Sequence, residues 1–315
     1  MNFDLTDDQR ALVTGIRDLC AGHFPMEHVQ ELEAEGGFDA TGWRALHDAG
    51  VFALRVPEAE GGVGLGMAEA ALVYTELGRA LVPGPVIGTH LGAGLVPGAA
   101  LGVIAPSQNP VLLAYPDVVD VIVVAGDDAL LAVNRSELAL QHVAQPLDPL
   151  TPLATVEHLP AGRPVGGAEE AGRFRRDGAV LAAAVLLGIA EAVTERSTAY
   201  AKQREQFGRP IGGFQAVKHL LADMVVRTEI ARAAVYAAAV HCDDPAVGDM
   251  DRAASAAKLL AGQGALANAK AAIQVHGGMG FTWEVPLHLF LKRAAFLDVA
   301  FGGTEEHAEA MAAGL

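Results

Sequence analysis

Cysteine and positive charge are both scarce in this chain of 315 residues. Cys20 and Cys242 are the only cysteines, too few for a disulfide framework or for the paired cysteines of a metal site. Lys and Arg together number 22 against 38 for Asp and Glu, a formal net charge of −16. Such a charge repels nucleic-acid phosphates and anionic membranes. We therefore expect no metal site and no nucleic-acid partner.

The sequence also lacks an uninterrupted apolar run long enough to cross a membrane. Residues 80–116 carry no formal charge, but Pro83, Pro85, Pro97, Pro106 and Pro110 interrupt them, which excludes one continuous helix. The apolar run Gly178–Ala190 is bounded by Asp177 and Glu191 and is shorter than a bilayer requires, so it predicts a buried core helix. The first ten residues have neither the basic start nor the apolar core of a signal peptide. These features predict a cytoplasmic protein without membrane insertion.

Composition places the chain among folded globular proteins. Hydrophobic residues make up 51% and charged residues 19%, which allows ample burial and argues against general disorder. The chain is long enough for one large domain or for two to three closely packed ones. The residue patterns divide it into a helical part (1–108), a β-rich part with a linker (109–172) and a second helical part (173–315).

Helical patterns dominate the first part. Thr6 is a suitable N-cap residue. Asp7 and Asp8 come directly after it, and their carboxylates are favoured at the positive end of the helix dipole. The turn-rich run from Pro57 to Gly66 separates the first helices of this part from the later ones. Further helices are expected at Gly42–Ala49, Met67–Ala80 and Pro85–Val96.

Short aliphatic and β-branched runs replace the helical pattern from Asn109 onward. Turn-forming residues such as Gly126-Asp-Asp128 separate them, which is typical of hairpins. We expect one small sheet of about five strands, followed by a Gly- and Pro-rich linker at Pro160–Gly172. The expected strands are Val111–Ala114, Val118–Val124, Leu130–Val133, Leu138–Val143 and Pro152–Val156.

Long helices return in the last part and predict a four-helix-type bundle. Gly277 and Gly278 come after the third of these helices, as expected just past a helix C-terminus. The overall prediction is a mostly α protein with a small β domain. The expected helices are Gly178–Gln203, Phe214–His241, Asp249–Val275, Val285–Phe296 and one after Thr304.

Several residues of this last part have the chemistry of a nucleotide site. Gly277, Gly278 and Gly280 would let backbone N–H groups approach a pyrophosphate without an intervening Cβ. Arg204 supplies a planar, permanently charged fork for phosphate or ribose oxygens. Each of these residues alone also fits a purely structural role. Only their combination indicates a nucleotide site.

Three C-terminal segments together resemble the acyl-CoA dehydrogenase family, flavoproteins that desaturate acyl-CoA thioesters between the α and β carbons. The segments run from Tyr200 to Gln215, from Gln274 to Phe281 and from Arg293 to Thr304. The runs Phe3–Thr6 and Val56–Gly66 also resemble the first helical domain of that family. The resemblance implies the family's architecture: an N-terminal helical domain, a middle β domain and a C-terminal helical bundle.

The resemblance also implies which residues bind the cofactor. In the family, the matching residues hold the ADP part of FAD and reach it from the neighbouring subunit. His219, His276 and Glu205 lie nearby but are expected to be structural or solvated. The residues that match the family's ADP contacts are Arg204, Phe207, Gln215, Gln274, Gly277 and Gly278.

The catalytic base of the family has no counterpart at either matching position. The family usually carries a glutamate in a Tyr-Glu-Gly-Thr run, and the residues here are Phe301-Gly302-Gly303-Thr304, with Gly302 at the glutamate position. A minority of the family places the base near the start of the first long C-terminal helix, which corresponds to Gly178. Asp177 is the nearest candidate for a relocated base. Glu305 and Glu306 are expected in the first turn of the last helix.

The middle of the chain also lacks the family's two flavin-ring motifs, a Thr-Glu-Pro…Gly-Ser-Asp run and a Gly-x-Lys-x-Trp-Ile-Thr run. The chain thus resembles the short subunits of heteromeric acyl-CoA dehydrogenases that act on bulky steroid-derived thioesters. That resemblance implies an α2β2 complex in which a full-length partner supplies the ring pocket and the glutamate. Two alternatives stay open: a flavin-free scaffold or binding homo-oligomer, and a self-sufficient dehydrogenase with a base such as Asp177.

Overall fold

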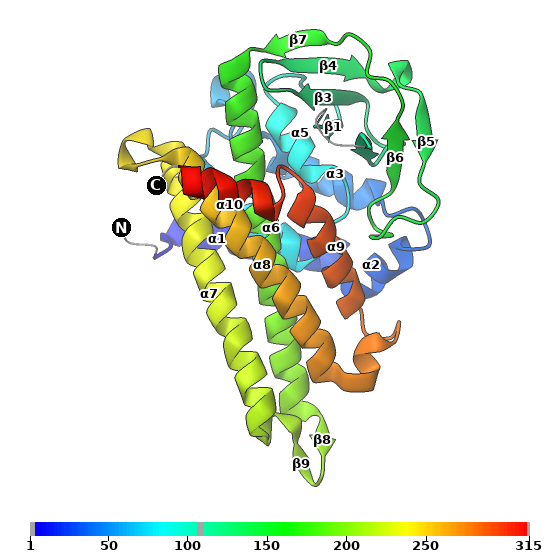
Figure 1. Ribbon diagram of the computed structural model, residues 1–315, viewed down its shortest axis with the longest axis vertical. Helices are drawn as coiled ribbons and strands as arrows, with labels where there is room; N and C mark the ends of the chain where they lie inside the picture. Colours follow the sequence, from blue (N-terminus) through cyan, green and yellow to red (C-terminus); the bar gives the residue numbers. More distant parts are fainter. Residues whose placement is uncertain (1–3, 106–109, 314–315) are drawn as a thin grey trace.

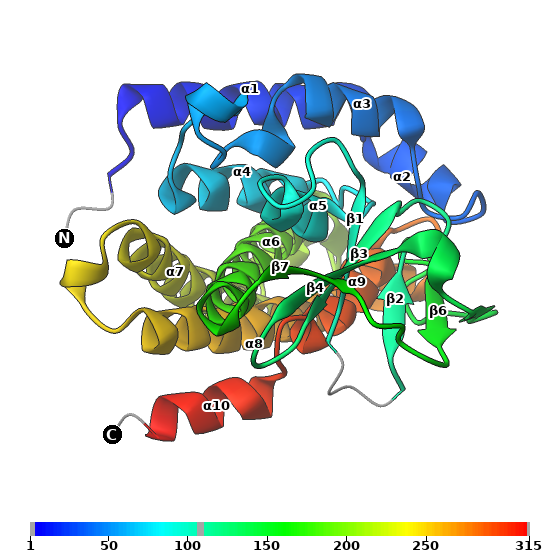
Figure 2. The same ribbon diagram turned by 90° about the horizontal axis from the view of Figure 1, so that it is seen from above.

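The computed structural model describes residues 4–105 and 110–313, and in this part of the chain helices predominate over two small sheets and one two-stranded hairpin. Figure 2 shows the N-terminal helices as an outer layer, a long central helix below them, and the remaining long helices beyond it, with the sheets beside these layers. The predicted mostly α architecture with a small β domain is confirmed. Phe3 and the domain boundary expected at residues 108 and 109 lie outside the described residues.

The N-terminal helices begin at the predicted cap. The Thr6 hydroxyl accepts a hydrogen bond from the backbone N–H of Gln9 at 3.2 Å, and the Gln9 side chain accepts one from the N–H of Thr6 at 3.1 Å. This reciprocal pair satisfies two otherwise unpaired N–H groups. α2 is not predictable from the sequence, because it is too short to show a helical period. The helices are α1 (Asp7–His23), α2 (Met26–Leu32), α3 (Ala40–Asp48), α4 (Met67–Arg79) and α5 (Val86–Gly92).

The strands between Leu101 and Gly166 form two sheets, so the prediction of one small sheet of about five strands is wrong. One sheet has the order β1-β3-β4-β7 and the other β2-β6-β5; β1 and β3 are parallel and the other pairs are antiparallel. β1 lies in the part expected to be helical, and β7 lies in the expected linker. The strands are β1 (Leu101–Ile104), β2 (Leu112–Ala114), β3 (Val121–Ala125), β4 (Leu130–Asn134), β5 (Leu140–His142), β6 (Leu153–Val156) and β7 (Arg163–Gly166).

The C-terminal helices form the bundle in Figure 1. The first of them begins ten residues earlier than predicted, because the Glu170 carboxylate accepts a hydrogen bond from the N–H of Gly167 at 2.9 Å and caps the helix inside the expected linker. A two-strand hairpin, β8 (Glu205–Gln206) and β9 (Arg209–Pro210), comes after it. The helices are α6 (Ala168–Gln203), α7 (Gln215–Asp243), α8 (Met250–His276), α9 (Leu287–Val299) and α10 (Thr304–Ala313).

Glycines let α4 and α6 approach each other closely. A Cβ at Gly188 of α6 would overlap the carbonyl oxygen of Thr75, and a Cβ at Gly78 of α4 would overlap the carbonyl oxygen of Val185. The contact is therefore reciprocal, with each helix presenting a glycine to the backbone of the other. This contact joins the N-terminal helices to the C-terminal bundle.

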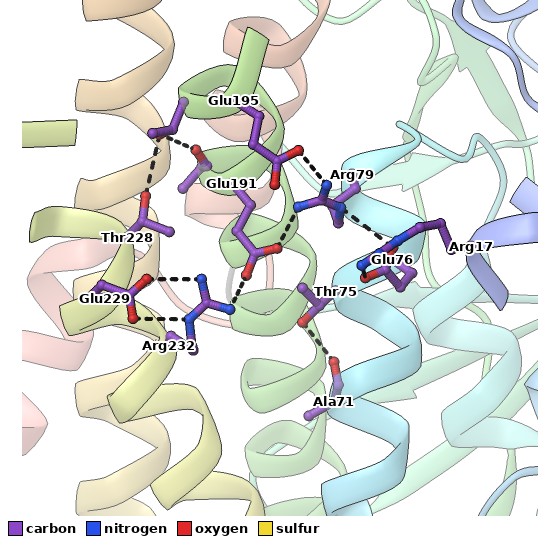
Figure 3. A network of polar contacts seen from close by, with 12 residues as sticks. Arg17, Ala71, Thr75, Glu76, Arg79, Glu191, Glu195, Thr228, Glu229 and Arg232 are labelled. Atoms are coloured by element: carbon purple, nitrogen blue, oxygen red, sulfur yellow. Dashed lines mark hydrogen bonds and ion pairs between the residues drawn. The ribbon is translucent and has the colours of Figure 1, made fainter. Parts of the chain in front are cut away.

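A network of charged residues crosses the same junction (Figure 3). Arg79 of α4 contacts Glu76 at 3.4 Å, and it contacts Glu191 and Glu195 of α6 at 2.7 and 2.5 Å. Arg17 of α1 donates two hydrogen bonds to Glu76. Glu76 and Glu191 are buried, and these cationic partners offset the cost of removing their carboxylates from water.

The far side of this network reaches α7. Arg232 contacts Oε1 of Glu191 at 2.9 Å, an ion pair that lacks the alignment of a hydrogen bond, and it forms a paired contact with Glu229. Burial raises the pKa of Glu191, although the charges of Arg232 and Arg79 oppose that shift. The network therefore connects α1, α4, α6 and α7 around the carboxylate of Glu191, whose charge is stabilised by Arg232 and Arg79.

Candidate functional site

The six predicted nucleotide-binding residues lie at one end of the helical bundle. α6 ends, α7 begins and α8 ends at this end, which Figure 1 shows at the bottom, away from the two sheets. Tyr200 near the end of α6 stacks on His276 at the end of α8, with ring centroids 4.1 Å apart. The alternating direction of the three helices thus brings together residues that are far apart in the sequence.

Arg204 and Phe207 project from the hairpin between α6 and α7. Arg204 is exposed, and its guanidinium has no hydrogen bond or ion pair within the described part of the chain. Phe207 is 92% exposed and adopts a left-handed backbone conformation (φ 53°) at the hairpin turn. Its ring meets Phe214 edge to face, with centroids 6.1 Å apart. A large apolar side chain that is exposed to solvent on a strained backbone indicates a surface that contacts a ligand or a partner.

Gln215 and Gln274 complete the polar part of this surface. Gln215 is the first residue of α7, and its side-chain nitrogen lies 2.9 Å from Nε2 of His219. Gln274 is exposed in the last turn of α8. His276 is buried and bonds the carbonyl of Ala272, in agreement with the structural role predicted for it.

The glycines after α8 divide into two groups. Gly277 (φ 60°) and Gly278 are exposed, and a Cβ on either would meet no described atom within 4 Å. Gly280 is buried, and a Cβ there would lie 2.5 Å from the carbonyl oxygen of Ile273. Gly280 is therefore needed for packing against α8, whereas Gly277 and Gly278 leave open room beside their backbone. Together with the Arg204 cation and the Phe207 ring, this room suits an anionic nucleotide.

A separate cavity of about 930 Å³ lies near the other end of α6. Its walls come from α5, α6, α8, α9, α10 and the strands β1, β2 and β6. None of the six nucleotide-end residues lines it. Because its lining comes from so many separate elements, no local pattern in the sequence indicated the cavity.

Of the two positions that match the family's base, Gly302 lines this cavity, whereas Gly178 lies behind the ring of Phe301, which lines it. The ring of Phe301 occupies the space where a side chain at Gly178 would begin. Gly302 has φ 97°, and a Cβ there would lie 2.7 Å from Nε2 of His307. The Gly302 carbonyl accepts a hydrogen bond from the buried Lys258 at 3.0 Å, and burial lowers the pKa of Lys258 to about 8. Neighbouring groups thus hold residue 302 in place and fill the room beside it.

Gly302→Glu is expected to lower the free energy of unfolding by about 2 kcal/mol, because a side chain at positive φ is strained and also meets the His307 ring. Urea unfolding measures this change. Gly303→Glu is the matched control, since a Cβ at Gly303 meets no described atom within 4 Å. A second substitution, His307→Ala, should restore part of the loss. Equal stability of the Gly302→Glu and Gly303→Glu variants would contradict the packing described here.

The candidate for a relocated base, Asp177, has another role. It is buried, and its carboxylate accepts a hydrogen bond from Arg55 of the N-terminal part at 2.7 Å. It is not among the described residues that line the cavity. Glu305 and Glu306 lie in the first turn of α10, as predicted, and Glu306 accepts a hydrogen bond from the N–H of Gly303. The geometry therefore favours a structural role for Asp177.

Two further properties concern the described residues. α6 has the length and apolar character of a membrane span, but its most apolar stretch is entirely buried inside the protein, as predicted for a core helix. Across residues 4–105 and 110–313, no three His, Cys, Asp or Glu side chains are grouped to hold a metal ion.

Comparisons with known proteins agree with the resemblance. Residues 6–102 match the model of the acyl-CoA dehydrogenase N-terminal domain, and residues 167–315 match that of the acyl-CoA dehydrogenase C-terminal domain. The chain is 34% identical over 303 residues to acyl-CoA dehydrogenase IpdE2 of Mycobacterium tuberculosis, covering 91% of both chains. It is also 34% identical to acyl-CoA dehydrogenase FadE34 of the same organism, covering 95% of this chain and 47% of FadE34.

Solved structures show the same fold. The ChsE4-ChsE5 complex from Mycobacterium tuberculosis contains a chain of 26% identity with a TM-score of 0.86, covering 99% of this chain and 98% of that one. The Tcur3481-Tcur3483 steroid ACAD G363A variant gives a TM-score of 0.86 at 24% identity, covering 98% and 97%. The chain therefore belongs to the acyl-CoA dehydrogenase family, oxidoreductases that act on CH–CH bonds and typically bind FAD.

Proposed function

We propose that this chain is the short subunit of a heteromeric acyl-CoA dehydrogenase and that it contributes the ADP-binding half of an FAD site to a full-length partner. The substrate class that we propose is a bulky, steroid-derived acyl-CoA. Two structurally similar proteins, ChsE4-ChsE5 and the steroid ACAD Tcur3481-Tcur3483, have names that pair two different chains. These names support a heteromer, for which α2β2 is the proposed stoichiometry.

The observation that carries the proposal is the position of the predicted nucleotide residues. They lie at the end of the bundle where α6 ends (Figure 1), whereas the α6 residues that line the chain's own cavity lie in the first half of this helix, between Gly172 and Val185. A dinucleotide held at this surface would have its ADP end here, and its reactive ring would lie outside the cavity of this chain. Such an arrangement supports catalysis only when a second subunit covers the surface and surrounds the reactive ring.

The residues at this end fit the ADP part of FAD. Arg204 offers an unpaired guanidinium for phosphate oxygens, Phe207 offers an exposed ring, and the room beside Gly277 and Gly278 admits a close backbone approach. When bound, FAD would accept the hydride that leaves the β-carbon of the substrate. In this proposal the chain itself binds and orients the ADP end.

Glycine at positions 178 and 302 supports a catalytic base on the partner. Removal of the α-proton needs a carboxylate opposite the flavin ring. A Cβ at Gly178 would meet the Phe301 ring and a Cβ at Gly302 would meet the His307 ring, so a glutamate at either position requires one of these rings to move. The flavin-free scaffold stays an alternative, but it gives no reason for an unpaired arginine beside an exposed phenylalanine.

Arg204→Ala is expected to weaken FAD binding by the co-expressed complex about 10- to 100-fold, the effect of losing one charged hydrogen-bond donor to phosphate. The flavin absorbance per complex and a titration with added FAD measure this loss. Lys202→Ala is the matched control, because it removes an exposed cation from the same helix end. The heteromer itself should still form in both variants.

Three results would contradict the proposal. Unchanged flavin content in the Arg204→Ala complex would show that the site is assigned to the wrong residues. A colourless homodimer that ignores a full-length partner would favour the scaffold. Yellow protein that is active alone would favour a self-sufficient dehydrogenase.

A further inference from the structure

One aromatic contact joins the two segments that carry the nucleotide-end residues. The ring of Tyr200, in the last turn of α6, lies nearly parallel to the ring of His276, the last residue of α8; the centroids are 4.1 Å apart and the planes differ by 19°. Tyr200 precedes Arg204 by about one helical turn, and His276 directly precedes Gly277. The stack therefore connects the segment of the unpaired arginine with the segment of the exposed glycines.

The backbone fixes Arg204 relative to the Tyr200 ring. The Tyr200 carbonyl accepts a hydrogen bond from the N–H of Arg204 at 2.8 Å, and the Arg204 carbonyl accepts one from the N–H of Ile211 at 2.8 Å. A Cβ at Gly212 would lie 2.9 Å from the carbonyl oxygen of Ala201, so the returning end of the hairpin also packs closely on α6. The main chain of Arg204 is thus held in place, although its side chain is exposed.

The ring of His276 is held as firmly as that of Tyr200. It is buried, and its Nδ1 donates a hydrogen bond to the Ala272 carbonyl at 2.8 Å. Burial lowers the pKa of His276, so the ring is uncharged at neutral pH. Gly277 and Gly278 have no side chains to anchor them, and the adjacent His276 ring therefore holds the start of their backbone.

The other ring contacts of this end do not connect α6 with α8. The Arg209 guanidinium lies over the Phe214 ring at 4.1 Å, and Phe207 meets the edge of the same ring, so both contacts stay within the hairpin and the start of α7. In the described part of the chain, the Tyr200–His276 pair is the ring contact that joins the ends of α6 and α8.

We propose that Tyr200 and His276 are positioning residues for the nucleotide: their stack fixes the separation between the Arg204 guanidinium and the open backbone at Gly277 and Gly278, so that both reach one pyrophosphate. The proposal rests on the proposed FAD site and adds two residues that act through others. A site arranged in advance binds more tightly, because less conformational freedom is lost when the ligand binds.

Tyr200→Leu tests the stack, because leucine retains apolar packing but has no flat ring. FAD titration of the co-expressed complex after removal of its flavin should show binding about 3- to 10-fold weaker, the effect of losing one aromatic pair. Tyr200→Phe and His276→Phe each keep two flat rings and should bind FAD like the original complex. Tyr236→Ala is the matched control, since it removes a partly buried tyrosine from the distant half of α7 and should lower stability without changing FAD affinity.

Two further measurements separate positioning from general stability. The double variant Tyr200→Leu/Arg204→Ala should bind FAD about as weakly as Arg204→Ala alone, because Tyr200 acts through Arg204. Hydrogen exchange of the free chain needs no FAD. Tyr200→Leu should speed exchange at the N–H of Ile211, which is bonded to the Arg204 carbonyl, and Tyr200→Phe should not.

The two proposals can fail separately. Unchanged FAD affinity in Tyr200→Leu, with a clear loss in Arg204→Ala, overturns the positioning role and leaves the FAD site in place. Losses that multiply in the double variant, or unchanged exchange at Ile211, also overturn the positioning role. Unchanged FAD affinity in Arg204→Ala overturns the FAD site itself and this proposal with it.

Discussion

Replacing Arg79 with Met should lower the free energy of unfolding by about 3–5 kcal/mol, because it removes the cation that three carboxylates share. Glu76 and Glu191 would stay buried, with only Arg17 and Arg232 left to compensate them. The cost comes mainly from the uncompensated charge, since the Met side chain retains most of the apolar contact of the arginine stem. Urea unfolding at neutral pH measures it.

The effect of Arg79→Met should depend on pH. Burial already raises the pKa of Glu191, and loss of Arg79 removes an opposing charge, so the folded variant takes up a proton more readily than the unfolded chain. The loss in unfolding free energy caused by Arg79→Met should therefore become smaller as pH falls toward the pKa of Glu191. The double variant Arg79→Met/Glu191→Gln should recover stability at neutral pH in the same way.

Arg17→Met is the matched control for this network. Arg17 also contacts Glu76, but its side chain is 56% exposed, and Glu76 would keep Arg79 as a partner. We expect a loss of about 0–1 kcal/mol, the usual effect of a surface ion pair. Equal losses for Arg17→Met and Arg79→Met would show that burial does not determine the strength of these contacts.

Gly188→Ala should cost about 3 kcal/mol, although alanine is the better helix former. The new Cβ would meet the carbonyl oxygen of Thr75 and the backbone nitrogen of Arg79, and neither can move without shifting α4. Thermal and urea unfolding should both show the loss. Gly15→Ala is the matched control, because Gly15 is an exposed helical glycine with no described atom near its Cβ position. That variant should gain about 0.5–1 kcal/mol, and a comparable gain at Gly188 would contradict the close contact of α4 with α6.

Elements with clear end signals could be predicted from the sequence. The sequence pattern predicts a helix over Met67–Ala80, and α4 ends one residue earlier, at Arg79. It also predicts a helix over Asp249–Val275, and α8 begins and ends one residue later, at Met250 and His276. β1 is not predictable because its four apolar residues show no period that separates a strand from a helix. The start of α6 is not predictable, because Gly172 and its neighbours have the local preference of a linker. Tertiary burial of the helix outweighs this preference.

The candidate site could be predicted only in part. The chemistry of Arg204 and of the glycines after α8 is evident in the sequence, but that Gly280 serves packing is visible only from its contact with Ile273. The ring of Phe301 over Gly178 and the His307 ring beside Gly302 depend on tertiary contacts that no local pattern encodes. The cavity escapes sequence reasoning for the same reason. The assignment of the six ADP contacts stays a prediction.

The central helix α6 has a consequence for how the protein unfolds. It packs against α4 and α5, against α7, α8 and α9, and against β3, β4 and β7. No group of elements on either side of it can separate without exposing part of its apolar surface to water. We therefore expect native-state hydrogen exchange to show one highly cooperative unit that includes all these elements, with independent opening confined to peripheral segments such as the hairpin that carries Phe207.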